Sequence, residues 1–251
     1  MANETIKPTD ISLIGGVLII GSLLWDKEKI RIEWRTKYLD DVKNSKNVSA
    51  PIRYGRISKE RNCTFTMIFS SECKQPDKLG KAKYVSFKEN PVNLTILGIQ
   101  ATELIKAENK KKVLDFKRYN WKWGALGLCI NPKNLEANSE KRGQATLLIE
   151  FWKKNYANGF NPEEYKVGHE TPILTKDGLF EIDWTNDLED IDFFIGTATK
   201  PELKEYPKTK NIADRIIVND YDIYFRENCD IGIITFQDKE ISEFLNRQKD
   251  K

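Results

Sequence analysis

The chain is poor in the residues that build metal centres and disulfide frameworks. Its 251 residues include a single histidine, His169, and four cysteines, no two of which form a CxxC pair. A zinc site needs clustered Cys and His ligands, so this composition argues against a metal site. Isolated cysteines in a chain of this size fit a reducing compartment, which predicts free thiols and a cytoplasmic protein.

A membrane-spanning run and a strong net charge are lacking as well. The apolar run at residues 11–24 has 14 residues, whereas a helix needs about 20 to span a bilayer. We interpret it as a buried strand, because neither a basic segment before it nor a cleavage site after it indicates a secretory signal. The formal charge is only +3, from 41 basic and 38 acidic residues. This near balance argues against a dedicated nucleic-acid-binding protein.

The basic and aromatic segment at residues 106–123 is the one local exception to that balance. Its aromatic side chains could stack on bases while its lysines meet phosphates, which leaves a nucleic-acid binder as a third hypothesis. We favour a basic loop followed by a strand with buried aromatic residues. The sequence carries no signal for an oligomeric state.

The pattern of apolar residues predicts a mixture of helices and strands. Alternating or continuous apolar runs predict strands at residues 13–20, 48–58, 64–70, 82–87, 124–130, 179–184, 212–218 and 231–236. Helical spacing predicts helices at residues 34–42, 94–108, 145–156 and from residue 238 onward. Because the strands and helices do not alternate strictly, the pattern favours an α+β fold over a doubly wound sheet.

A short glycine turn ends the first predicted strand. Ile20 closes the strand, and Gly21, Ser22, Leu23 and Leu24 follow it. Glycine lets a ligand approach the backbone closely, and successive N–H groups at such a turn can hold an anion or a carbonyl oxygen. The alternative is an ordinary tight turn with no ligand, since short glycine motifs often occur without one.

Glu108 is the carboxylate that the sequence singles out. It follows Leu104 by four residues and Ile105 by three, so on a continuous helix it lies on the apolar face, whereas Glu103 does not. An apolar environment disfavours the charged form and raises the pKa of a carboxyl group, which suits a general acid or base near neutral pH. The alternative is that the helix ends earlier and Glu108 reaches water, as the lysines at 110–112 would also allow.

Three arginines downstream of the turn form a further group of candidates, because an arginine near the turn could bind a substrate carboxylate through two hydrogen bonds. They are Arg53, Arg56 and Arg61, and in an extended strand Arg53 and Arg56 point to opposite faces. We choose Arg53 as the candidate, because Pro51 and Ile52 indicate that its strand enters the core. The alternative is that these side chains are solvated or ion-paired.

Taken together, these stretches resemble the γ-glutamylcyclotransferase-like superfamily, whose signature is a YGSL or YGSN turn after the first strand and a catalytic glutamate downstream. The matching stretches are VLIIGSLLW at residues 17–25 and LIKAE at residues 104–108. PIRYGR at residues 51–56 and TFTMIFS at residues 64–70 stand where the family has its next strands. The resemblance covers roughly residues 13–130, and Ile20 takes the place of the family's tyrosine.

The resemblance implies a fold and a division of the chain. It implies a small mixed β-barrel flanked by helices at residues 1–135, followed by an α/β extension at residues 136–251 packed on that core. It also implies an enzyme that needs no cofactor. In such an enzyme the turn would hold a small molecule with a γ-glutamyl-like group, and Glu108 would be the general base that leads to release of 5-oxoproline. The alternative is an inactive binding or interaction module on the same fold, which the loss of the tyrosine at Ile20 favours.

Overall fold

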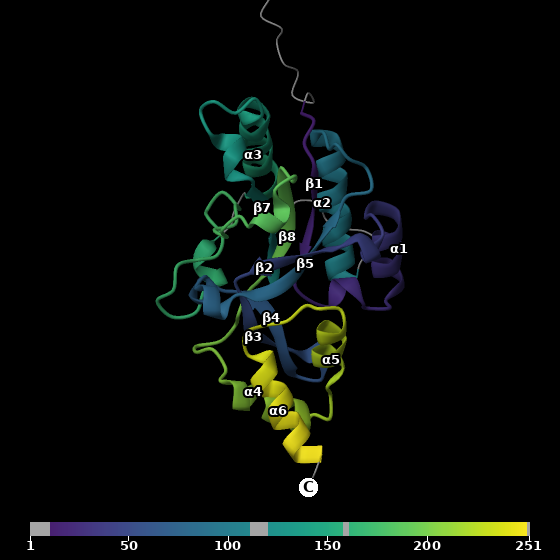
Figure 1. Cartoon of the computed structure of the whole chain (residues 1–251), viewed down its shortest axis with the longest axis vertical. Helices are drawn as coiled ribbons and strands as arrows, with labels where there is room; N and C mark the ends of the chain where they lie inside the picture. Colours follow the sequence, from purple (N-terminus) through teal and green to yellow (C-terminus); the bar gives the residue numbers. More distant parts are fainter. Residues whose placement is uncertain (1–10, 111–119, 158–160, 250–251) are drawn as a thin grey trace, which may run out of the picture.

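The chain folds into a mixed α+β structure of six α-helices and eight strands in the part described, which comprises residues 11–110, 120–157 and 161–249 of a computed structural model (Figure 1). The strands are β1 (Gly15–Ile19), β2 (Lys46–Ala50), β3 (Ile52–Ser58), β4 (Thr64–Phe69), β5 (Gly80–Ser86), β6 (Asn120–Trp121), β7 (Gly124–Ile130) and β8 (Phe193–Thr199). The helices are α1 (Lys29–Tyr38), α2 (Leu94–Asn109), α3 (Arg142–Tyr156), α4 (Thr209–Val218), α5 (Ile223–Asp230) and α6 (Asp238–Lys249). The predicted α+β class is therefore confirmed.

One open sheet and one hairpin contain all the described strands. Six strands form the sheet in the order β2-β5-β1-β8-β7-β6, and β3 pairs with β4 in a separate hairpin. Only β1 and β8 run parallel; the other neighbouring pairs are antiparallel. Since β2 and β6 are the two edges, the described strands do not close, and the predicted small mixed β-barrel is corrected to an open sheet with a hairpin. Closure depends on which distant strands meet, which local patterns do not encode.

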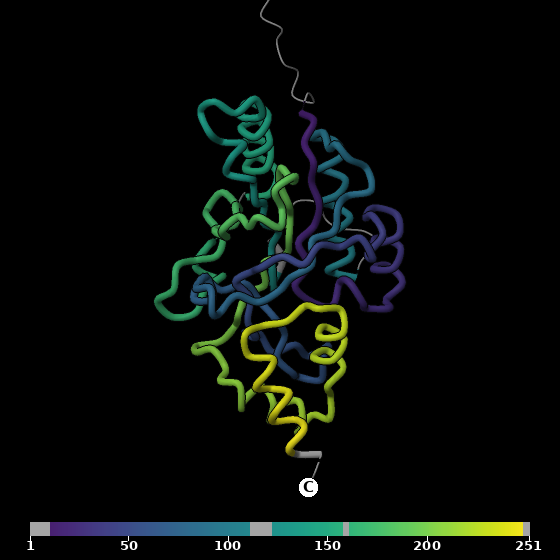
Figure 2. The backbone as a smooth tube through the Cα atoms, in the orientation of Figure 1, coloured from purple at the N-terminus to yellow at the C-terminus, as the bar shows by residue number. Residues whose placement is uncertain are grey.

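The sheet combines strands from both sides of position 135, where we place the boundary between core and extension. Strand β8 comes from the second half of the chain, yet it lies between β1 and β7 near the middle of the sheet. The tube in Figure 2 shows this green segment running beside the purple first strand. The division into residues 1–135 and 136–251 remains a prediction.

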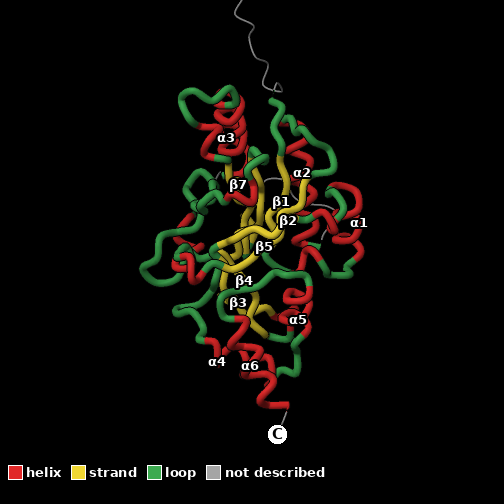
Figure 3. The backbone as a smooth tube through the Cα atoms, viewed as in Figure 1, coloured by secondary structure: helices red, strands yellow, loops and turns green. Residues whose placement is uncertain are grey.

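The helices lie around the strands (Figure 3). Helix α1 packs on α2 beside the sheet, and α3 packs on β7. Helices α4 and α6 pack on each other, and α4 also contacts β4. Figure 1 shows α4, α5 and α6 gathered at the hairpin end of the molecule, away from α3. No helix in the described ranges is long and apolar enough to cross a bilayer.

Most predicted elements in the first half are confirmed, whereas three predicted strands in the second half are wrong. Residues 212–218 belong to helix α4, and residues 179–184 and 231–236 make only isolated bridges. The β-branched run at residues 216–218 suggested a strand, but Ile212, Ala213 and Ile216 are buried at helical spacing. Strand β8 and helix α5 were not predicted. The first predicted helix also begins earlier than expected, at Lys29.

Two glycines allow the central strands to pack closely. Every residue of β1 is buried. A Cβ atom added at Gly16 would lie 2.3 Å from the carbonyl oxygen of Val85 on the neighbouring strand, and one at Gly15 would lie 2.2 Å from the ring of Phe193. These positions therefore have no room for a side chain unless the backbone moves.

Gly16→Ala should destabilise the fold by about 1–3 kcal/mol, because the added methyl group meets backbone that cannot rotate away. Gly143→Ala is the matched control: Gly143 is exposed on α3, and an added Cβ would meet nothing within 4 Å. It should leave stability unchanged or raise it by about 0.4–1 kcal/mol. Urea unfolding of the two variants measures both effects, and equal midpoints would contradict the close packing of β1.

Candidate functional site

Helix α2 carries Glu108 into the interior. The Asn93 side chain caps the helix by accepting a hydrogen bond from the Ile96 N–H at 2.9 Å. The helix continues to Asn109, and Lys110 ends it in the left-handed conformation. Glu108 therefore lies on the last helical turn, where only 9% of its side chain is exposed.

A single guanidinium group connects Glu108 to the glycine turn. Arg31 on α1 is 5% exposed, and its Nη2 lies 3.6 Å from Oε2 of Glu108. Its Nη1 donates to Oγ of Ser22 at 3.0 Å, and its Nε donates to the carbonyl oxygen of Ala107 at 3.1 Å. Helix α1 thus joins the end of α2 to the turn that follows β1.

Asp26 pairs with Nη1 of the same guanidinium, whereas Glu108 lies near Nη2. Its Oδ2 accepts hydrogen bonds from Nη1 of Arg31 at 2.8 Å and from Nη2 of Arg61 at 2.5 Å. Burial raises the pKa of Asp26, but the hydrogen bond from the Glu28 N–H and the two guanidinium groups outweigh burial, so the pKa lies below its ordinary value. Asp26 is therefore a stable anion at neutral pH.

The charged form of Glu108 is disfavoured by burial. Burial raises its pKa above the ordinary value, although Arg31 and the side chain of Thr197 lower it and Asp26 raises it further. Arg31 is its only ion-pair partner in the described ranges, and Arg31 already pairs with Asp26 at a shorter distance. Glu108 is thus a buried carboxyl group whose pKa is shifted towards neutral pH, as a general acid or base requires.

The apolar side chains of the turn are buried in the core, so a ligand at the turn would contact its backbone groups. Ile20, Leu23 and Leu24 are 6–9% exposed and pack in the main hydrophobic cluster. Within the described part of the chain, the backbone N–H groups of Ser22 and Leu23 have no acceptor. The predicted substrate-binding turn therefore has backbone donors without a described acceptor, and Ser22 also contacts Arg31.

The hydroxyl group of Tyr224, which lies on helix α5 in the second half of the chain, packs beside Gly21 of the turn. A Cβ atom added at Gly21 would lie 2.8 Å from the Tyr224 hydroxyl oxygen, so a larger residue here would require the Tyr224 side chain to move. That oxygen accepts a hydrogen bond from the Met67 N–H at 3.1 Å. Burial raises the pKa of Tyr224 to about 12, so the hydroxyl is neutral and keeps its proton at physiological pH.

Arg53 has no described contact with this cluster. Its Nη1 pairs with Oε2 of Glu72 at 2.9 Å, and its guanidinium lies 3.8 Å from the ring centroid of Tyr206. Arg56 pairs with Glu202 at 3.7 Å. Of the three arginines named from the sequence, Arg61 is the one that the structure brings to the candidate site.

Sequence reasoning missed Arg31, Asp26, Thr197 and Tyr224. A signal for Arg31 was present, because it precedes Trp34 by three residues and Tyr38 by seven and so shares the inward face of that helix. Thr197 and Tyr224 come from strands and helices far along the chain, and no local spacing relates them to the turn.

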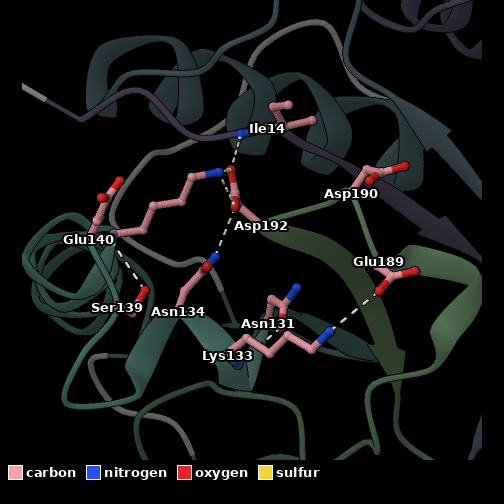
Figure 4. Close-up of a pocket in the computed structure, with 10 residues that line it drawn as sticks. Ile14, Asn131, Lys133, Asn134, Ser139, Glu140, Glu189, Asp190 and Asp192 are labelled. Atoms are coloured by element: carbon pink, nitrogen blue, oxygen red, sulfur yellow. Dashed lines mark hydrogen bonds and ion pairs between the residues drawn. The ribbon is translucent and has the colours of Figure 1, made fainter.

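A surface pocket of about 510 Å³ lies elsewhere, where the start of β1 meets the segments around residues 131–141 and 189–192 (Figure 4). Asp192 at its wall is 4% exposed and accepts hydrogen bonds from the Ile14 N–H, the Asn134 amide and the Lys141 ammonium group. These donors satisfy the carboxylate, so we interpret it as a structural junction. No group of metal ligands is found within the described residues.

The basic and aromatic segment at 106–123 is largely outside the described residues, which omit 111–119. At its end, the Trp123 ring lies 5.4 Å from the guanidinium of Arg56. The nucleic-acid hypothesis for this segment therefore remains a prediction.

The raised pKa of Glu108 predicts how its removal changes stability with pH. Between the ordinary pKa and the raised one, the native state binds more protons than the unfolded state, so this group's contribution to stability falls as pH rises. Glu108→Gln should therefore gain stability relative to wild type as pH rises from about 4 to neutral. Urea unfolding at several pH values measures the difference. Glu89→Gln, which removes a solvent-facing carboxyl group, is the control.

No protein-family model matches the chain, nor does any curated protein or solved structure with which it was compared. The candidate site therefore rests on the chain's own geometry. That geometry joins a glycine turn, a buried carboxyl group and an arginine that contacts both.

Proposed function

We propose that this protein is a γ-glutamylcyclotransferase-like enzyme that releases 5-oxoproline from a γ-glutamyl amine or a related small molecule. One observation carries the proposal: the largely buried carboxyl group of Glu108 is connected to the glycine turn by one guanidinium group, that of Arg31. A base near a row of free backbone donors is the minimum that such a ring closure needs. The open sheet does not reproduce the barrel implied by the resemblance, so the proposal rests on the site rather than the fold.

In this mechanism Glu108 is the general base. It takes a proton from the α-ammonium group of the substrate, and its raised pKa makes it a better proton acceptor than an ordinary carboxylate. The freed amine attacks the γ-carbonyl carbon, which forms the ring C–N bond and places a negative charge on the carbonyl oxygen. When that oxygen reforms its double bond, the original amide C–N bond breaks, and the leaving amine takes the proton from Glu108. The ring nitrogen still carries the extra proton that it kept when it attacked, and the Glu108 carboxylate accepts this second proton. The ring amide is then neutral, and Glu108 passes the proton on to the released amine.

The turn has the second role. The N–H groups of Ser22 and Leu23 hold the γ-glutamyl part of the substrate so that the amine reaches its own carbonyl carbon. Holding reactive groups in contact contributes more to such a ring closure than proton transfer does. The mechanism requires no cofactor or metal, and we place the enzyme in the cytoplasm because its cysteines are free.

Glu108→Gln should lower kcat for 5-oxoproline release by about 10²–10⁴-fold, because glutamine keeps the shape of the side chain but cannot accept the proton. Glu103→Gln is the matched control on the same helix, where Glu103 pairs with Lys106 at 2.6 Å on the helix surface. It should keep wild-type activity. The assay measures 5-oxoproline released from a panel of γ-glutamyl amines.

Two outcomes would contradict the proposal. Equal activity of Glu108→Gln and wild type would remove Glu108 from the mechanism. Binding of γ-glutamyl compounds without any turnover would instead favour the inactive binding module, for which Ile20 in place of the family's tyrosine is the supporting feature.

A further inference from the structure

The surface pocket of about 510 Å³ beside Asp192 lies outside the candidate site, and the proposed function makes no use of it. Its volume falls within the range of small-molecule sites, which is about 300–1,000 Å³. Three segments form its wall: the start of β1 at Ile14, residues 131–141 and residues 189–192 (Figure 4). A molecule held in this pocket would therefore contact parts of the chain that are far apart in sequence.

The wall of this pocket has a surplus of negative charge. It carries four carboxyl groups and two lysines, which gives it a formal charge of −2 at neutral pH. These residues are Glu140, Glu189, Asp190, Asp192, Lys133 and Lys141. The whole chain has a formal charge of +3, so the surplus is local. A concave surface with charge of one sign raises the local concentration of ions of the opposite sign.

Both lysines are already neutralised by carboxylates of the same wall. The ammonium group of Lys141 donates to both carboxylate oxygens of Asp192, at 2.7 and 2.8 Å. The ammonium group of Lys133 lies 3.6 Å from Oε1 of Glu189. The surplus charge is therefore located on the remaining two carboxylates of the wall.

Those two carboxylates belong to Glu140 and Asp190. Within the described ranges, neither side chain has an ion-pair or hydrogen-bond partner, whereas Asp192 has three donor groups. Figure 4 shows Glu140 and Asp190 on opposite sides of Asp192. Because carboxylates are pure acceptors, two unpaired ones at different places on the wall match a ligand with a cationic donor at each end.

The amide oxygen of Asn134 adds a neutral acceptor to the same wall. Asn134 is 8% exposed, and its amide nitrogen donates to Oδ1 of Asp192 at 2.9 Å. No described residue donates to its amide oxygen, although nearly all buried polar groups in proteins are paired. An ammonium group has three N–H donors, so it can pair with a carboxylate and with this oxygen together.

An organic cation fits this pocket better than a metal ion does. A magnesium or calcium ion needs several oxygen ligands at about 2.0–2.6 Å around one point. Among the residues that the structure describes, no group of acidic, histidine or cysteine side chains is arranged in that way. The wall also includes Ile14, which is 39% exposed and can pack against methylene groups.

We propose that this pocket binds a small aliphatic diamine, whose two ammonium groups pair with Glu140 and Asp190 and whose methylene chain lies against Ile14. Asp192 and Lys141 stay in place as part of the wall. The inference makes no use of γ-glutamyl chemistry, so it can fail or hold independently of the proposed function. Because the ligand contacts three segments of the folded chain, its binding also stabilises the folded state.

An NMR titration tests the proposal, since backbone amide shifts show where a ligand binds. Diamines of increasing chain length, from putrescine to hexamethylenediamine, cover the spacing between the two carboxylates. The best of them should shift the amide signals of residues 131–141 and 189–192 and reach saturation. Butylamine, with one ammonium group, should bind about two- to fivefold more weakly, which is the contribution of one exposed ion pair. Butanediol, which has no charge, should not bind.

Variants of the two unpaired carboxylates give a second test. Glu140→Gln and Asp190→Asn should each weaken diamine binding by about two- to fivefold. Glu136→Gln and Asp187→Asn are the matched controls, because they remove the same charge from exposed positions nearby that do not line the pocket. Both controls should bind the diamine as wild type does.

Four outcomes would overturn the proposal. An equal response to butanediol would show that charge is not recognised. Equal weakening by the test variants and the controls would show diffuse attraction to an acidic surface. Shifts that do not saturate, or that lie at other residues, would show an adventitious additive only. Saturation by magnesium or calcium chloride at a lower concentration than the diamine would assign the pocket to a metal ion.

Discussion

The positive charge of Arg31 lies where water cannot hydrate it, and the candidate site depends on how that charge is balanced. Its three committed nitrogen-to-oxygen contacts join the turn after β1, the loop at Asp26 and the end of α2. Removal of one partner of such a buried pair typically costs about 3–5 kcal/mol, because the other charge is left alone. One side chain thus fixes the relative positions of three segments that are separate in sequence.

Local patterns predicted the elements whose own residues determine them. Strand β4 alternates cleanly, and α2 has a capping asparagine and a continuous apolar face, so both were found with correct ends to within a residue or two. Helix α4 was mistaken for a strand because β-branched residues favour strands in isolation, whereas packing against α6 and β4 decides the outcome. The pairing of β8 with β1 and β7 joins segments that are far apart in sequence, and no local sequence pattern indicated it.

Local sequence patterns likewise predicted only part of the candidate site. Helical spacing predicted Glu108. The same reasoning would have found Arg31 if the helix containing Trp34 and Tyr38 had been extended by one turn towards the N-terminus. The choice of Arg53 assumed that a strand entering the core would bring its arginine to the turn, but the Arg53 side chain pairs with Glu72 and lies over the ring of Tyr206 instead. Tyr224 reaches the turn from the other half of the chain, and only tertiary structure brings it there.

The central position of β8 has a consequence for how the chain is made. During synthesis β1 and β7 leave the ribosome long before residues 193–199, so each waits with one hydrogen-bonding edge open. The sheet is completed only when the last of its strands enters between two that already exist. Until then the nascent chain exposes two unpaired strand edges with apolar side chains. Such edges favour aggregation, so the chain at this stage is a substrate for chaperones.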